Sequence, residues 1–217
     1  MPSNPQKFPP ATGIPALAAI YDENAAQYYQ VFNYSLQQIP CNTSSSAQYS
    51  LARNCIDCAN AYKQWLCAVT IPRCEDVGNN ASWLQLRNVK QLFPNGSHFT
   101  LLETDPRLPF LNQVAYNSSR NPIIDEQIKP GPYSELLPCD DLCYDLVQSC
   151  PASLGFGCPN PGKGLEMSYG TRTNIDGQLT CSYLGAAYFL GGAERLGGLK
   201  MWSTWMVILS AILWLSL

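Results

Sequence analysis

The chain has 217 residues, of which 46% are hydrophobic, so it is long and apolar enough for one or two globular domains. Its formal net charge is -3, and its 13 Lys and Arg residues are scattered rather than gathered in one run. Because nucleic-acid binding depends on clustered positive charge, we expect no nucleic-acid partner.

The N-terminal part predicts an extended lead-in followed by one amphipathic helix. Residues 1–20 are rich in proline, which favours a linker or an extended segment. From Tyr21 to Ile39 the apolar residues recur at helical spacing, and Pro40 stops the pattern. Residues 21–190 are then predicted to form one cysteine-rich domain.

A second helix is predicted between Leu51 and Cys67. Its residues Cys55, Cys58, Tyr62 and Trp65 share one helical face, and Leu66 follows directly, so we expect Tyr62, Trp65 and Leu66 to pack around the cysteines.

Residues 75–138 contain no cysteine and several prolines, and this range predicts a long glycosylated excursion with one helix around Ser82–Phe93. Pro138 and the acidic pair Asp140 and Asp141 then mark the start of another helix, which Pro151 ends. A glycine-rich stretch follows Cys158.

Residues 191–217 predict a C-terminal lipid-anchor signal or a short membrane helix. The stretch from Met201 to Leu217 is uncharged, but as a helix it would reach only about 25 Å, whereas a membrane span needs about 20 residues. Small residues from Gly191, a polar spacer and an apolar end follow the order of a glycosylphosphatidylinositol signal. We therefore expect the anchor at Gly191, with Gly197-Gly198 and Gly185-Ala186-Ala187 as alternative attachment sites. A retained membrane helix or a buried helix is the alternative to an anchor.

The cysteines and the glycosylation motifs point to the same compartment. Ten cysteines form an even set, which in an oxidising compartment indicates a disulfide framework, although spacing alone leaves the connectivity open. Five Asn-x-Ser/Thr acceptors accompany them, at Asn33, Asn42, Asn80, Asn95 and Asn117. The cysteines are Cys41, Cys55, Cys58, Cys67, Cys74, Cys139, Cys143, Cys150, Cys158 and Cys181. The two features together predict an extracytoplasmic protein.

No apolar stretch follows Met1–Lys7, so a secretory signal peptide is not recognised in this sequence. An extracytoplasmic domain needs one. We therefore expect the chain to be the C-terminal portion of a longer secreted protein, or its start to be a mispredicted gene start.

The sequence gives little support for a catalytic site or a metal site. Zinc-binding folds normally contain two short Cys-x2-Cys motifs, whereas the residues from Cys55 to Cys74 contain only one. Oxidation would also consume the thiolates that bind zinc. A thioredoxin-like redox site at Cys55 and Cys58 would need a strand before the helix. His98 is the only histidine, and no pair of carboxylates stands out. We expect no enzyme activity, no metal and no cofactor.

The cysteine spacing resembles a known family signature. Cys58-x8-Cys67-x6-Cys74, followed by Cys139-x3-Cys143-x6-Cys150, is similar to the Frizzled-type cysteine-rich domain. A closer resemblance is to the fungal Mid-type regulatory subunits of the high-affinity, stretch-activated calcium channel. It is carried by Asn54-Cys-Ile-Asp-Cys58, by Tyr62-Lys-Gln-Trp-Leu-Cys-Ala-Val-Thr-Ile-Pro-Arg-Cys74, by the run from Arg120 to Cys139, and by Asp141-Leu-Cys-Tyr-Asp-Leu-Val-Gln-Ser-Cys-Pro151.

The resemblance implies a mainly α, small disulfide-rich, Frizzled-like cysteine-rich domain with long glycosylated loops. It implies the bridges Cys41–Cys74, Cys55–Cys67, Cys58–Cys150, Cys139–Cys181 and Cys143–Cys158.

In function it implies a non-catalytic auxiliary subunit that docks on the extracellular side of a pore-forming calcium channel subunit and supports calcium influx. The expected location is the extracellular face of the plasma membrane, reached through the endoplasmic reticulum. Two alternatives stay open: a Frizzled-like module that binds a lipid or secreted ligand, and a lipid-anchored cell-surface enzyme.

Overall fold

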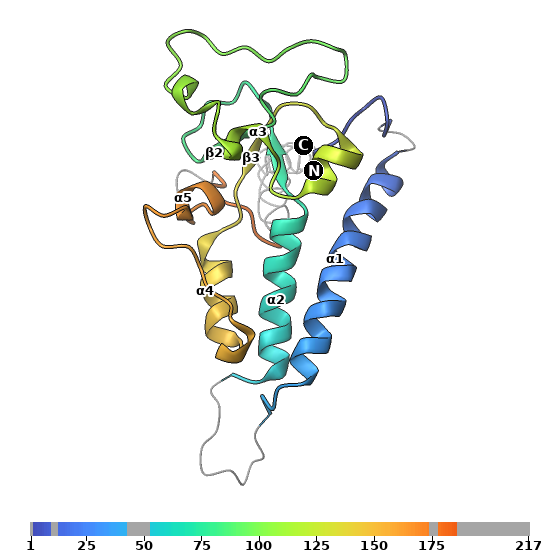
Figure 1. Ribbon diagram of the computed structural model, residues 1–217, viewed down its shortest axis with the longest axis vertical. Coiled ribbons are helices and arrows are strands. Elements are labelled where there is room, and N and C mark those ends of the chain that lie inside the picture. The colour runs from blue at the N-terminus through green and yellow to red at the C-terminus, as the bar shows by residue number, and fades with distance from the viewer. Residues whose placement is uncertain (1, 10–12, 43–52, 174–177, 186–217) are drawn as a thin grey trace, which may run out of the picture. The chain divides into compact units, whose positions relative to one another are not determined.

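The computed structural model describes residues 2–9, 13–42, 53–173 and 178–185 (Figure 1). The chain divides into a compact unit from Met1 to Leu184 and a second unit from Gly185 to Leu217. Only Gly185 of the second unit is described, so the fold below is that of the first unit. The proposed anchor at Gly191 and the apolar tail lie outside the described residues.

The first helix, α1, spans Ile14–Gln37 and begins well before the predicted start at Tyr21. A proline in its first turn favours this start, because the first amide groups of a helix have no partner within it. Leu17 and Tyr21 lie one turn apart and are both buried, so the last residues of the predicted lead-in belong to the helix and to the core.

Helix α2 spans Cys55–Thr70 and packs between α1 and α4, which spans Asp140–Ser149 (Figure 1). Asn54 caps α2 by accepting from the amide groups of Ile56 and Asp57, while the Asp57 side chain accepts from the Asn54 amide. This reciprocal cap explains why the helix starts where the cysteine-containing face begins. Acidic residues in the first turn of α4 complement its dipole, as the sequence predicts.

A three-stranded antiparallel sheet is the element that the sequence did not predict. It consists of β1 (Arg73–Glu75), β2 (Leu84–Arg87) and β3 (Tyr133–Leu136), in the order β1-β3-β2. The helix expected around Ser82–Phe93 is therefore wrong, because β2 occupies this range and pairs with β3 along its length. Pairing with β3, distant in the sequence, decided this structure rather than local periodicity.

Parts of the segment between β1 and β3 contribute to the core, although its length suggested one long loop. It contains the short elements η1 (Leu108–Phe110), α3 (Val114–Asn117) and η2 (Ile124–Ile128). Ile124 and Ile128 are completely buried and pack with Tyr21 of α1 in one apolar cluster. Farther along the chain, η3 spans Ala152–Leu154 and α5 spans Leu165–Ser168. The described unit is thus a disulfide-rich assembly of helices with a small sheet.

Candidate functional site

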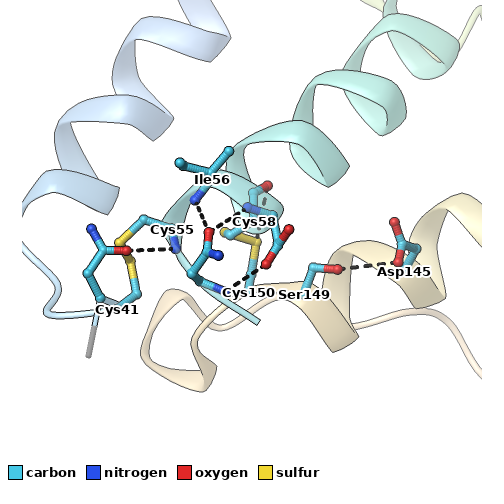
Figure 2. Close-up of a disulfide and its surroundings, with 10 residues drawn as sticks. Cys41, Cys55, Ile56, Cys58, Asp145, Ser149 and Cys150 are labelled. Atoms are coloured by element: carbon cyan, nitrogen blue, oxygen red, sulfur yellow. Dashed lines mark hydrogen bonds between the residues drawn. A yellow bond between two sulfur atoms is a disulfide. The ribbon is translucent and has the colours of Figure 1, made fainter. Parts of the chain in front are cut away.

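Four disulfides join the described elements, and two of them lie at the start of α2. Cys58 in the first turn of α2 bonds to Cys150 at the end of α4, and Cys41 beyond α1 bonds to Cys55 (Figure 2). The other two are Cys139–Cys181 and Cys143–Cys158. The bridges therefore tie α1, α2 and α4 to one another at one end of the helices and fasten the later segments to α4.

Three of these pairs are those that the resemblance implies, and Cys41–Cys55 is a correction. The expected pair Cys55–Cys67 is impossible while both residues belong to α2, since twelve helical residues span about 18 Å. A disulfide requires its Cα atoms to lie within about 7 Å. Cys41 is also remote from Cys74, because Cys74 packs beside Tyr21, far along α1 from the end that precedes Cys41.

Cys67 and Cys74 consequently carry free thiols. Burial raises the pKa of the Cys67 thiol, and the nearby charge of Asp22 adds to the effect. Burial also raises the pKa of the Cys74 thiol. Since the thiolate is the reactive form, neither group has the properties of a catalytic nucleophile.

A buried ionic cluster lies beneath the sheet, where β2 and β3 meet. The carboxylate of Glu135 is fully buried and accepts from Arg87 Nε at 2.7 Å and from Arg120 Nε at 2.5 Å. Arg87 also donates to the main-chain oxygens of Ala115 and Met167, and Arg120 to that of Ser168. The cluster therefore connects the sheet to the segments around α3 and α5.

This cluster is not predicted from the sequence, because a charged residue in a short segment is usually exposed. One signal was available: Glu135 is the one charged residue in the short segment Tyr133-Ser-Glu-Leu136, and Arg87 ends the alternating segment Leu84-Gln-Leu-Arg87. A charge in a strand-like apolar context is a candidate for burial with a partner.

The residues expected to pack around the cysteines form an aromatic cluster on α2. Tyr62 stacks on Phe32 of α1 with ring centroids 3.7 Å apart, and Trp65 Nε1 donates to the Tyr169 hydroxyl at 2.8 Å. Burial raises the pKa of Tyr62, so this side chain stays neutral. Leu66 is buried in the same cluster, which is the packing role that the sequence predicts.

A cavity of about 430 Å³ opens above this aromatic cluster. Its walls are the α2 side chains Tyr62, Trp65 and Val69, together with Tyr28 of α1 and Arg120. The volume is in the range of small-ligand pockets, and more of the lining is apolar than polar. We call this the aromatic cavity.

The five glycosylation acceptors differ in exposure. Asn42, Asn80 and Asn95 are exposed, whereas Asn33 in α1 and Asn117 in α3 are partly buried. Asn80 Oδ1 accepts from Arg107 at 2.7 Å, an interaction that does not occupy the amide nitrogen to which a glycan would be attached. Glycosylation at the five acceptors remains a prediction.

The described residues contain no group of three or more His, Cys, Asp or Glu side chains placed to hold a metal ion. His98 is exposed in the loop before Phe99. None of the helices in the described part of the chain combines the length and the hydrophobicity that a membrane span requires.

Comparison with known proteins places the chain among channel components. The family described as a stretch-activated Ca2+-permeable channel component matches residues 1–187. The stretch-activated cation channel yam8 of Schizosaccharomyces pombe is 44% identical over 200 residues, covering 92% of this chain and 35% of that protein. The stretch-activated cation channel MID1 of Saccharomyces cerevisiae is 34% identical over 173 residues, covering 78% of this chain and 26% of that protein.

The corresponding MID1 protein of Cryptococcus neoformans is 29% identical over 147 residues, or 68% of this chain and 22% of that protein. This chain thus spans about a third or less of the curated relatives it matches. No solved structure matches. Because the family match extends over most of the sequence, the chain belongs to the family of stretch-activated Ca2+-permeable channel components.

Proposed function

We propose that this chain is an extracellular, non-catalytic auxiliary subunit that docks on the pore-forming subunit of a fungal calcium channel and supports calcium influx. Its family consists of channel components, and its relatives are named as channels rather than enzymes. The observation that carries the proposal is the disulfide framework of the described unit. Stable structural disulfides are typical of extracytoplasmic proteins, which favours docking from the outer side.

The proposal includes the modifications that the sequence predicts. N-glycans at Asn33, Asn42, Asn80, Asn95 and Asn117 and a lipid anchor at Gly191 would hold a glycosylated domain at the outer face of the plasma membrane. Anchoring would raise the local concentration of the domain near the channel, which strengthens even a modest interaction. Phospholipase release of the surface protein tests the anchor, and an intact Trp214 in the mature protein would contradict it.

The proposed Frizzled-like character supports one alternative, a module that binds a lipid or secreted ligand. The aromatic cavity is the observation that favours it, since such a module requires an open apolar pocket. Uptake of a fluorescent fatty acid by the purified chain, together with failure to bind the pore-forming subunit, would replace the channel-subunit proposal with this one.

Co-purification tests the proposed function directly. The full chain, with a secretory signal peptide added at its N-terminus and an affinity tag, is expressed with the pore-forming calcium channel subunit in the secretory pathway of the same cells. We expect the two proteins to co-purify in mild detergent, and calcium uptake to rise above that of cells expressing the pore subunit alone. If the correctly oxidised chain neither co-purified with the pore subunit nor changed calcium uptake, the proposal would be contradicted.

A further inference from the structure

A second cavity adjoins the aromatic one on the surface of α1. It has a volume of about 380 Å³ and lies between α1 and η2. The two cavities share the residues Tyr28, Asn121 and Pro122, so they are neighbouring halves of one surface. We call the second half the acidic cavity and both halves together the α1 groove.

The ridge that separates the two halves is held in place by a contact between distant segments. Asn121 Nδ2 donates to Asn24 Oδ1 at 2.7 Å and thereby joins the segment before η2 to α1. Tyr28, which stands on the same ridge, is 52% exposed. The groove is therefore preformed, and a partner can reach its central side chain.

The two halves favour different side chains. In the aromatic cavity, Arg120 already donates to Glu135 and to the main chain, so the apolar walls dominate recognition there. In the acidic cavity, the exposed Glu23 and Glu126 make no ion pair with the described part of the chain. Lys7 donates to the main-chain oxygen of Gln127 rather than to either carboxylate.

We propose that the α1 groove receives an extended segment of the partner protein that carries a large apolar side chain close to a Lys or Arg. The apolar side chain would enter the aromatic cavity, and the cation would lie between Glu23 and Glu126. This inference rests on the proposed function and deepens it, because it assigns the surface that docks on the pore-forming subunit.

Charge favours this occupant over a lipid. A fatty acid or an anionic phospholipid would bring its negative charge next to Glu23 and Glu126, and Arg120 is already engaged by Glu135. The glycosylation acceptors also leave the surface open, since none of the five lines either cavity. Asn33 follows Tyr28 by five residues in α1, which rotates it about 140° around the helix.

The test measures the affinity of full-length variants for the pore-forming subunit in detergent. Truncating a central aromatic anchor costs about 30-fold in affinity at a typical interface hot spot, and we expect a loss of this size for Tyr28→Ala. Reversing both charges with Glu23→Lys and Glu126→Lys should weaken binding about tenfold, with a smaller effect at high salt. All three residues are exposed, so these variants should keep the wild-type thermal unfolding temperature.

The chain offers matched controls for both changes. Tyr34→Ala removes a tyrosine of α1 that is 55% exposed but lies outside the groove, and it preserves the Asn33 acceptor motif. Glu103→Lys makes the same charge change at an exposed loop residue. It is the control for Glu23→Lys and for Glu126→Lys when each is made alone. Both controls should bind as the wild type does.

The outcomes separate the two proposals. If the wild-type chain binds and the groove variants bind equally well, the groove assignment is overturned while the channel-subunit function stands. If the wild-type chain does not bind the pore subunit, both fail. The wild-type chain could instead take up a fluorescent fatty acid. If Tyr28→Ala abolished this uptake but bound the pore subunit as the wild type does, the occupant of the groove would be a lipid and the proposal would be overturned.

Discussion

Replacing Glu135 by Gln should destabilise the domain strongly, because it removes the one carboxylate shared by two arginines. The side chains of Glu135, Arg87 and Arg120 are 0%, 6% and 14% exposed. Glutamine keeps the shape and one acceptor oxygen but leaves both guanidinium charges buried without a carboxylate. Breaking a buried ion pair by removing one partner costs about 3–5 kcal/mol, so we expect a loss of that size in the free energy of unfolding.

Thermal unfolding followed by circular dichroism, without reductant, measures this loss. For a domain of this size, each kcal/mol corresponds to about 2–4 °C, so the midpoint should fall by about 6–20 °C. The matched control is Asp141→Asn, which removes the carboxylate from an ion pair with Arg172 whose side chains are 49% and 46% exposed. We expect the control to change stability by less than about 1 kcal/mol. If Glu135→Gln changed the free energy of unfolding no more than the control, burial would not determine what the cluster contributes to stability.

Three further predictions concern the cysteines and the cap of α2. Replacing both cysteines of Cys58–Cys150 by serine should lower the free energy of unfolding by about 4–5 kcal/mol, and the same change at Cys143–Cys158 by about 3 kcal/mol. The first loss is larger because that bridge closes a loop of 92 residues, whereas the second closes a loop of 15. Equal denaturation midpoints for the two variants would contradict this order. Iodoacetamide should label Cys67 and Cys74 when the chain is unfolded without reductant. Labelling of the native chain should be slow, because burial raises the pKa of both thiols. If the unfolded chain were not labelled, the described disulfide pairing would be wrong. Replacing Asn54 by Ala should lower the free energy of unfolding by about 1 kcal/mol in urea titrations, since two amide groups of α2 lose their acceptor, and an unchanged midpoint would show that the cap is redundant.

The sequence predicted the elements that depend on local signals. Periodic apolar residues and flanking prolines located α1, α2 and α4, although α1 extends farther toward the N-terminus than its pattern alone suggested. Helical geometry predicted that Cys58 and Trp65 share one face of α2, and Trp65 does pack in the aromatic cluster on α2. The resemblance to the fungal Mid-type channel components is confirmed by the comparisons, and it rested on short segments around the cysteines that a single sequence contains in full.

Only the tertiary structure decided which distant residues meet. The pairing of β2 with β3 overrode a weak helical pattern, because strand pairing depends on residues separated by a long stretch of chain. In the same way, Cys55 bonds to Cys41 because α2 holds Cys67 about 18 Å away along its axis. The α1 groove is likewise invisible in the sequence, since its ridge exists only where Asn24 and Asn121 come into contact. Periodicity reports which face of an element is buried, but the partner of that face is set by the folding of the whole chain.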